Sequence, residues 1–263
     1  MAGGHIVIGP QHLERLVAIE AQAHYSEPPP LGQKPFVVVR RGAPVLLSAP
    51  HGCRVLRSGE GWHQEEEYTA AMALLLAELC GVSVIATLWR TDDSDPNDSD
   101  EERSAYKRAL REIVAAERTH LVIDLHGAAE NSPKMAPTQW VDLGLGKYNH
   151  SLPPMAAAAL LERIEHYLGA GVCDRRGRTG FPAGHGNRIR AFCRRKLQTF
   201  AVQVEMKPSV RVVQRRAEAT SFRQPVSAGG GQYAAPTQRV QGMVQALVDF
   251  ILAWLNNHFV ESR

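Results

Sequence analysis

The stretch LVIDLHG, residues 121–127, carries the strongest structural signal in this chain. Apolar residues lead into Asp124 and His126, and Gly127 then ends the run. An earlier stretch, VLLSAPHG (45–52), has the same form, an apolar run that ends in His51 and Gly52. Apolar runs of strand length that end in turn residues are typical of buried strands. Charged or polar side chains are costly in such a place unless they are paired or functional, so both strand ends indicate chemistry.

Strands and helices alternate outward from these two stretches. Further strands are expected at FVVVR (36–40), which a turn at Arg41-Gly42 joins to 45–49, at SVIATLW (83–89) and at FAVQVEM (200–206). Helices are expected at 11–22, in EEEYTAAMALLLAELCG (65–81), at 100–118 behind a capping box of Ser99 and Glu102, at 153–169 and at 237–258. This alternation predicts an α/β fold whose mostly parallel sheet has helices on both faces. In such sheets functional residues collect beyond the carboxyl ends of the strands.

Composition limits the classes of protein that the chain can belong to. Its 263 residues, 44% hydrophobic and 22% charged, predict one globular domain over 1–263, with 1–35 as an N-terminal extension and 237–258 as a closing helix. The net charge is +3 and the basic residues are dispersed outside 171–196, so no nucleic-acid partner is expected. There is no apolar run of the ~20 residues that span a bilayer, no export signal, and no CxxC pair among four cysteines. These features predict a cytoplasmic protein without a membrane partner; the oligomeric state stays open.

The two histidines at matching strand ends are candidate metal ligands. A catalytic zinc site takes three protein ligands from His and Asp or Glu and leaves one position for water. His51 and His126 would meet above the sheet edge, and the cluster EEEY (65–68) offers the acidic ligand. We favour Glu67 over Glu66 because it lies beside Tyr68 and Thr69, although the residues alone leave all three glutamates open. One zinc per chain is expected, and such a set also admits iron, cobalt or manganese.

Two more carboxylates belong to this prediction. Asp124 lies two residues before His126 on the same strand, so both side chains point to one face. A metal-bound imidazole usually donates its other N–H to a carboxylate, and Asp124 is expected to orient an imidazole in this way, that of His51 rather than of its neighbour. Glu205, late in a buried strand, is expected to be the base that takes a proton from water and passes it to the leaving amine.

In order along the chain, SAPHG, EEEYT, LVIDLHG and VQVEM resemble the N-formylglutamate amidohydrolase family, which is similar in fold to zinc carboxypeptidases and aspartoacylases. The resemblance covers about residues 36–211. It implies a three-layer αβα fold with a mixed central sheet, phosphorylase/hydrolase-like, and one zinc ion. It also implies hydrolysis of an amide on an N-acyl amino acid. His51, Glu67 and His126 would take the ligand positions and Glu205 that of the general base.

Two features depart from the related patterns. The acidic ligand follows the first histidine by three residues in the carboxypeptidase pattern, whereas Glu67 follows His51 by sixteen, which suits the formylglutamate branch. The formylglutamate enzymes also carry an Asp-x-Asn-Arg substrate motif. Here DPND (95–98) keeps Asp95 and Asn97 but lacks the arginine. The acyl group and the amino acid of the substrate are therefore left open.

An arginine is expected to hold the substrate carboxylate, because its planar fork matches that group. Arg188 and Arg190 in HGNRIR and Arg211 in PSVR are the candidates, and we favour Arg188. Asn97 and His185 are counted with it as substrate-binding residues, and Arg211 with Glu205 as catalytic. The alternatives are a carboxypeptidase- or aspartoacylase-like deacylase with another substrate, and a ligand-binding module without turnover. Metal content would distinguish such a binding module from an enzyme, since an enzyme should retain about one zinc per chain.

Overall fold

The structure, a computed structural model, describes residues 6–57, 59–92, 95–146, 151–174, 188–219 and 237–256. Seven strands form one mixed sheet in the order β1-β5-β2-β6-β9-β7-β8. The strands of this sheet are, in chain order, β1 (Phe36–Val39), β2 (Val45–Ala49), β5 (Ser83–Thr87), β6 (Leu121–Gly127), β7 (Val141–Gly144), β8 (Cys173–Asp174) and β9 (Phe200–Met206). A separate hairpin pairs β3 (Val55–Arg57) with β4 (Gly61–His63).

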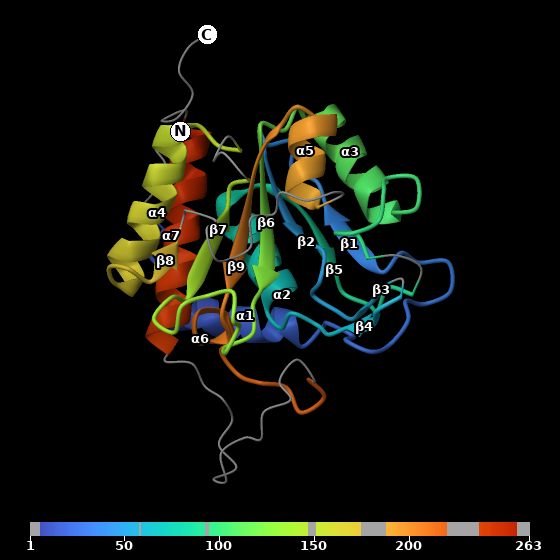
Figure 1. Cartoon of the computed structure of the whole chain (residues 1–263), viewed down its shortest axis with the longest axis horizontal. Coiled ribbons are helices and arrows are strands. Elements are labelled where there is room, and N and C mark those ends of the chain that lie inside the picture. The colour runs from blue at the N-terminus through green and yellow to red at the C-terminus, as the bar shows by residue number, and fades with distance from the viewer. Residues whose placement is uncertain are drawn as a thin grey trace.

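Helices cover both faces of the sheet, as Figure 1 shows. The helices are α1 (Pro10–Glu20), α2 (Thr69–Cys80), α3 (Ala105–Glu117), α4 (Pro154–Leu168), α5 (Ile189–Lys196), α6 (Pro208–Arg211) and α7 (Thr237–Leu255). The larger core joins α1, α2, α4 and α7 to one face of the sheet, and a smaller core joins α3 and α5 to the other. The result is three layers, αβα. Among the described residues, no helix combines the length and the apolar character that crossing a membrane requires.

The central strand β6 shows how the sequence creates these layers. Side chains alternate between the two faces of a strand, so Leu121, Ile123 and Leu125 pack into the larger core while Val122 packs into the smaller one. Asp124 and His126 are on the same face as Val122. They are buried as well. The polar end of β6 therefore lies inside the molecule, where each side chain needs a partner.

Parallel pairing brings the ends of three strands to one edge. β6 pairs in parallel with β2 and with β9, and the pairs β2–β5 and β7–β8 are parallel too. The strands β1 and β7 instead run antiparallel to β5 and β9. The mixed sheet and the three layers confirm the predicted fold class.

Several predicted elements differ from those observed. The strands at 36–40 and 45–49 were expected to be joined by a turn, but β1 pairs with β5, which lies between them in the sheet. The helix expected from 100 begins at Ala105, because the Ser104 side chain, rather than Ser99, accepts the Lys107 N–H as its cap. The glutamates of EEEY precede α2 instead of opening it, since Tyr68 adopts a left-handed conformation with φ 66°.

Candidate metal centre

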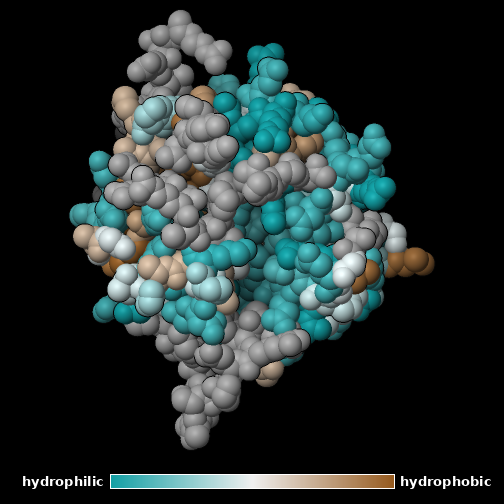
Figure 2. Space-filling view, viewed as in Figure 1, coloured by the Kyte–Doolittle hydropathy of each residue, from teal (hydrophilic) through white to brown (hydrophobic). Residues whose placement is uncertain are grey.

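The candidate metal centre lies at the carboxyl ends of β2, β6 and β9. His51 follows β2 by two residues, and the register pairs His126 of β6 with Glu205 of β9. The ring centroids of His51 and His126 are 4.9 Å apart, and both rings are buried. The structure thus brings together the three residues that we predicted from the ends of separate apolar runs. Figure 2, which has the same viewpoint as Figure 1, shows a hollow near the middle of the molecule that hydrophilic surface borders.

Glu66, not Glu67, occupies the centre of this group. Its Oε1 lies 3.0 Å from His51 Nδ1 and 3.2 Å from His63 Nε2, and its Oε2 lies 3.2 Å from His126 Nδ1. The Gly127 N–H also donates to Oε2, at 2.8 Å. One carboxylate therefore contacts three imidazoles, which is the arrangement that we had assigned to Glu67.

The chain around residues 65–69 explains which glutamate faces the centre. The Glu66 N–H donates to the His51 carbonyl at 2.8 Å, and Thr69 donates from both its N–H and its hydroxyl to the Glu66 carbonyl. Glu65 points elsewhere and pairs with Arg54 at 3.1 Å. The carboxylate of Glu67 is buried and interacts electrostatically with Glu20, Tyr25 and Arg211. The turn places neighbouring glutamates on different sides, so their order in sequence could not select the ligand.

Each of the two predicted histidine ligands has a carboxylate behind it. His126 Nε2 lies 3.0 Å from Asp124 Oδ2, and His51 Nε2 lies 2.8 Å from Asp95 Oδ1. Asp124 therefore orients its own neighbour rather than His51, and its other oxygen accepts the Ser48 hydroxyl. We had assigned Asp95 to a substrate motif and missed this role. Both rings turn Nδ1 to Glu66 and Nε2 to a carboxylate, as expected for paired metal ligands.

Sequence analysis also missed His63. It lies on β4, outside the main sheet, and its ring centroid is 4.8 Å from that of His51. Ligand atoms of His51, His63 and Glu66 all lie within 4.8 Å of one another, so among the described residues this trio is placed to hold a metal ion. The side chain of His63 is 28% exposed, unlike the fully buried rings of His51 and His126. The His-x-x-Glu spacing of residues 63–66 is the sequence signal that could have found it.

The charges of these groups shift one another's pKa values. Burial works against charge on both His51 and His126, yet the surrounding carboxylates raise the pKa of His51 to about 9 and that of His126 well above its ordinary value. Burial would raise the pKa of Glu66, but the charges of His51 and His126 hold it well below its usual range. Burial lowers the pKa of His63. Without a metal, protons therefore balance the negative charge of this cluster, and a bound cation would replace them.

Glu205 differs from the other carboxylates. Burial raises its pKa to about 7, and the charge of Glu66 adds to the shift while that of His126 opposes it. Gln203, on the same face of β9, donates from its amide to Glu205 Oε1. A carboxyl group with a pKa near neutrality is suited to accept and return protons at physiological pH.

The predicted substrate-binding residues have different surroundings. Asn97 is buried, and its Oδ1 accepts the N–H of Ile189, so it holds the start of α5. Arg188 directly precedes that helix; its side chain is partly exposed, with Nη1 3.4 Å from Asp98 Oδ1. His185 lies outside the described residues. Arg190 is buried and donates to the Ser151 hydroxyl.

Arg211, which we count as catalytic from the sequence, makes its hydrogen bonds to the main chain. Its guanidinium is buried and donates to the main-chain carbonyls of Met206, at 3.0 Å, and of Glu67. It also lies flat against Gly127, where a Cβ would come within 2.8 Å of Cζ. Arg211 therefore links the backbone of Glu67, the residue after Glu66, to the end of β9.

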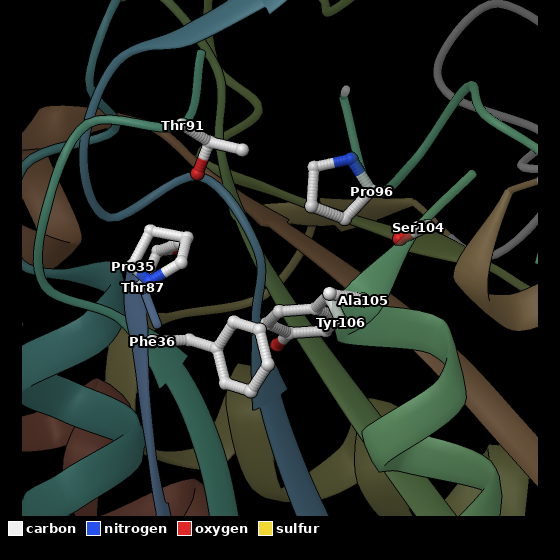
Figure 3. Close-up of a pocket in the computed structure, with 8 residues that line it drawn as sticks. All are labelled: Pro35, Phe36, Thr87, Thr91, Pro96, Ser104, Ala105 and Tyr106. Atoms are coloured by element: carbon white, nitrogen blue, oxygen red, sulfur yellow. The ribbon is translucent and has the colours of Figure 1, made fainter. Parts of the chain in front are cut away.

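A small cavity next to the loop that carries Asp95 is separate from the histidine cluster. Its volume is about 20 Å³, which is room for about one water molecule. Figure 3 shows Phe36, Thr91, Pro96 and Tyr106 around it. The Tyr106 hydroxyl is hydrogen-bonded to Ser48, Ala49 and Ile85. The residues that line this cavity include no carboxylate and no imidazole.

Comparison with solved structures identifies the fold. The gene product Atu2144 from Agrobacterium tumefaciens matches with a TM-score of 0.52 at 14% identity, over 85% of this chain and 97% of that chain. N-formylglutamate amidohydrolase from Ralstonia eutropha JMP134 matches with a TM-score of 0.50 at 14% identity, over 86% and 98%. A metallo-carboxypeptidase from Burkholderia cenocepacia has a TM-score of 0.45 at 12% identity, over 94% and 69%.

The chain has the fold of an N-formylglutamate amidohydrolase. The predicted resemblance is thereby confirmed at the level of the fold. No protein-family model and no curated protein matches the chain at the level of sequence. The activity consequently has to be argued from the residues at the site.

Proposed function

We propose that the chain is a metal-dependent amidohydrolase that cleaves the amide bond of an N-acyl amino acid. The observation that carries this proposal is the shared orientation of His51 and His126, each with Nδ1 on Glu66 and Nε2 on its own carboxylate. Hydrogen-bonded carboxylates fix the ring and raise its basicity, which a structural histidine does not need. Two imidazoles and a carboxylate at one point are the donor set of catalytic zinc.

The set of His51, Glu66 and His126 suits a zinc ion better than the same set with Glu67 in place of Glu66, because Glu66 contacts both histidines. His63 is the competing third imidazole, because it also contacts Glu66. We assign it to the open side of the site, since its side chain is partly exposed and sits on a hairpin outside the sheet. A zinc ion held there would supply Lewis acidity and lower the pKa of a water towards ~7.

Residues of the chain would carry out proton transfer and substrate binding. Glu205 lies across from His126 with a pKa near neutrality, so it would accept the proton of the attacking water and return it to the leaving amine. Arg188, which is partly exposed, would hold the substrate carboxylate, and Asn97 would fix the start of α5, the helix that follows Arg188. The acyl group is to be found by experiment.

The test is a panel of N-acyl amino acids, including N-formylglutamate, offered to purified protein with zinc and with a chelator. Hydrolysis that disappears with the chelator and returns with zinc supports the proposal. A protein that retains about one zinc but cleaves no substrate in the panel would instead be a binding module.

Variants identify the ligands by metal content. Glu66→Gln and His126→Ala should lose zinc and activity, whereas Glu67→Gln, the matched control one residue away, should retain zinc. His63→Ala should also retain zinc. Loss of zinc from His63→Ala together with its retention in His126→Ala would move the site to the trio of His51, His63 and Glu66.

A further inference from the structure

A buried carboxylate at the end of α1 has no place in the mechanism proposed above. Glu20 is the last residue of α1 and is 2% exposed. Leu13, Leu16 and Ile19 of the same helix pack into the larger core, so α1 is fixed against the body of the protein. Burying a carboxylate is costly unless strong hydrogen bonds compensate it, and the partners of Glu20 therefore indicate its purpose.

Two hydrogen-bond donors converge on one oxygen of the Glu20 carboxylate. Oε1 accepts the hydroxyl of Tyr25 and, at 2.8 Å, the main-chain N–H of Tyr68. Tyr68 is 48 residues away in sequence and lies two residues after Glu66. The carboxylate thus reaches directly into the turn that places the central ligand.

That turn has a conformation that its sequence does not favour. Tyr68 has φ 66° and ψ −3°, a left-handed conformation that residues other than glycine adopt at a cost. Such a conformation persists when surrounding contacts hold it. The far end of the side chain is fixed too, since its hydroxyl donates to the Gln214 carbonyl at 2.6 Å and accepts the Gln214 N–H at 3.1 Å.

The direction of Glu66 follows from this conformation. The left-handed residue separates the glutamates from α2, so that the Thr69 and Glu66 hydrogen bonds close a turn instead of extending the helix. Glu66 then faces His51 and His126, while Glu67 faces the side of Glu20. A right-handed Tyr68 would rotate the chain before it and remove Glu66 from the imidazoles.

We propose that Glu20 is a positioning residue, which holds Tyr68 in its left-handed turn together with Gln214 and thereby aims Glu66 at the histidines. This inference rests on the proposed function, because it takes Glu66 as a metal ligand. It also makes the N-terminal helix, expected to be an extension, a structural part of the metal centre.

The test compares Glu20→Ala with Glu20→Gln, whose amide oxygen can still accept both hydrogen bonds. We expect Glu20→Ala to weaken zinc affinity by about 10- to 100-fold, as the loss of supporting hydrogen bonds around metal ligands does. Glu20→Gln should bind zinc nearly as the unmodified protein does. Competition with a chromophoric chelator measures both. Unchanged zinc affinity in Glu20→Ala, or equal losses in the two variants, would overturn the proposal.

Leu16→Ala is the matched control for simple destabilisation. Leu16 is fully buried on the same helix, and its apolar side chain makes no hydrogen bond to the turn. It should lower the melting temperature and leave zinc affinity unchanged; a loss of affinity equal to that of Glu20→Ala would reduce Glu20 to a packing residue. If Glu20→Ala does not fold, Glu20→Asp replaces it, since the shorter side chain keeps the charge but draws the carboxylate oxygen away from the Tyr68 N–H. Native zinc affinity in that variant would refute the proposal.

A second readout does not depend on zinc or on turnover. In metal-free protein, the imidazole N–H protons that His51 and His126 direct at Glu66 should give downfield NMR signals, which Glu66→Gln would identify. Glu20→Ala should lose or shift these signals, and Glu20→Gln should keep them. If the protein bound zinc but cleaved no substrate, the proposed function would fail while this comparison still decided the role of Glu20.

Discussion

Replacing Glu20 with glutamine should change how stability depends on pH. Burial raises the pKa of Glu20 from an ordinary value of 4.5 to about 7, while hydrogen bonds from Tyr25 and Tyr68 oppose the shift. A carboxyl group whose pKa is higher in the folded protein stabilises the fold below the unfolded pKa. That stabilisation is lost as the pH rises through the folded pKa. The window is therefore pH 4.5 to about 7, and glutamine, neutral throughout, has no such loss.

The magnitude follows from the two pKa values. At about 1.4 kcal/mol for each pH unit between them, Glu20 contributes a loss of roughly 3 kcal/mol across the window. Other groups face the same carboxyl and are unchanged by the substitution, so their titration cancels in the comparison. These groups are Tyr25, Tyr68, Glu67, Arg211, Arg216 and Cys53.

Urea unfolding of metal-free protein at several pH values between 4.5 and 8 measures the effect. The free energy of unfolding of the unmodified protein, minus that of Glu20→Gln, should fall by roughly 3 kcal/mol across this range. Leu16→Ala, which removes no titratable group from the same helix, is the control and should give a constant difference. A constant difference for Glu20→Gln as well would show that the carboxyl does not titrate in this window, and the electrostatic argument would fail.

Three further predictions test the base, a close contact and a helix cap. Glu205→Gln should keep zinc but lower turnover by about two to four orders of magnitude, since the amide cannot accept the proton; normal rates would place the base elsewhere. Gly127→Ala should destabilise the protein by about 1–3 kcal/mol, because its Cβ would lie 2.8 Å from the Arg211 guanidinium, and an unchanged melting temperature would contradict this. Ser104→Ala should cost about 1 kcal/mol in urea unfolding, through loss of the cap on Lys107 N–H; no loss would mean that α3 does not depend on its cap.

The sequence alone was enough to place His51, His126 and Glu205 at one edge of a sheet. Each follows or ends an apolar run of strand length, and in a βα alternation the ends of parallel strands meet. The predicted runs at 45–49, 121–126 and 200–206 agree with β2, β6 and β9. Alternation along β6 likewise put Asp124 and His126 on one face. These features depend on residues close together in the chain, which is why a linear pattern reveals them.

Glu66 is the ligand candidate that such patterns could not select, since it stands beside two other glutamates. Its direction depends on the backbone conformation of Tyr68, which Glu20 and Gln214 hold from 48 and 146 residues away. The partner of His51 is equally remote: Asp95 lies 44 residues from it. In an irregular turn no repeat fixes where a side chain points, so hydrogen bonds to distant parts of the fold make the choice.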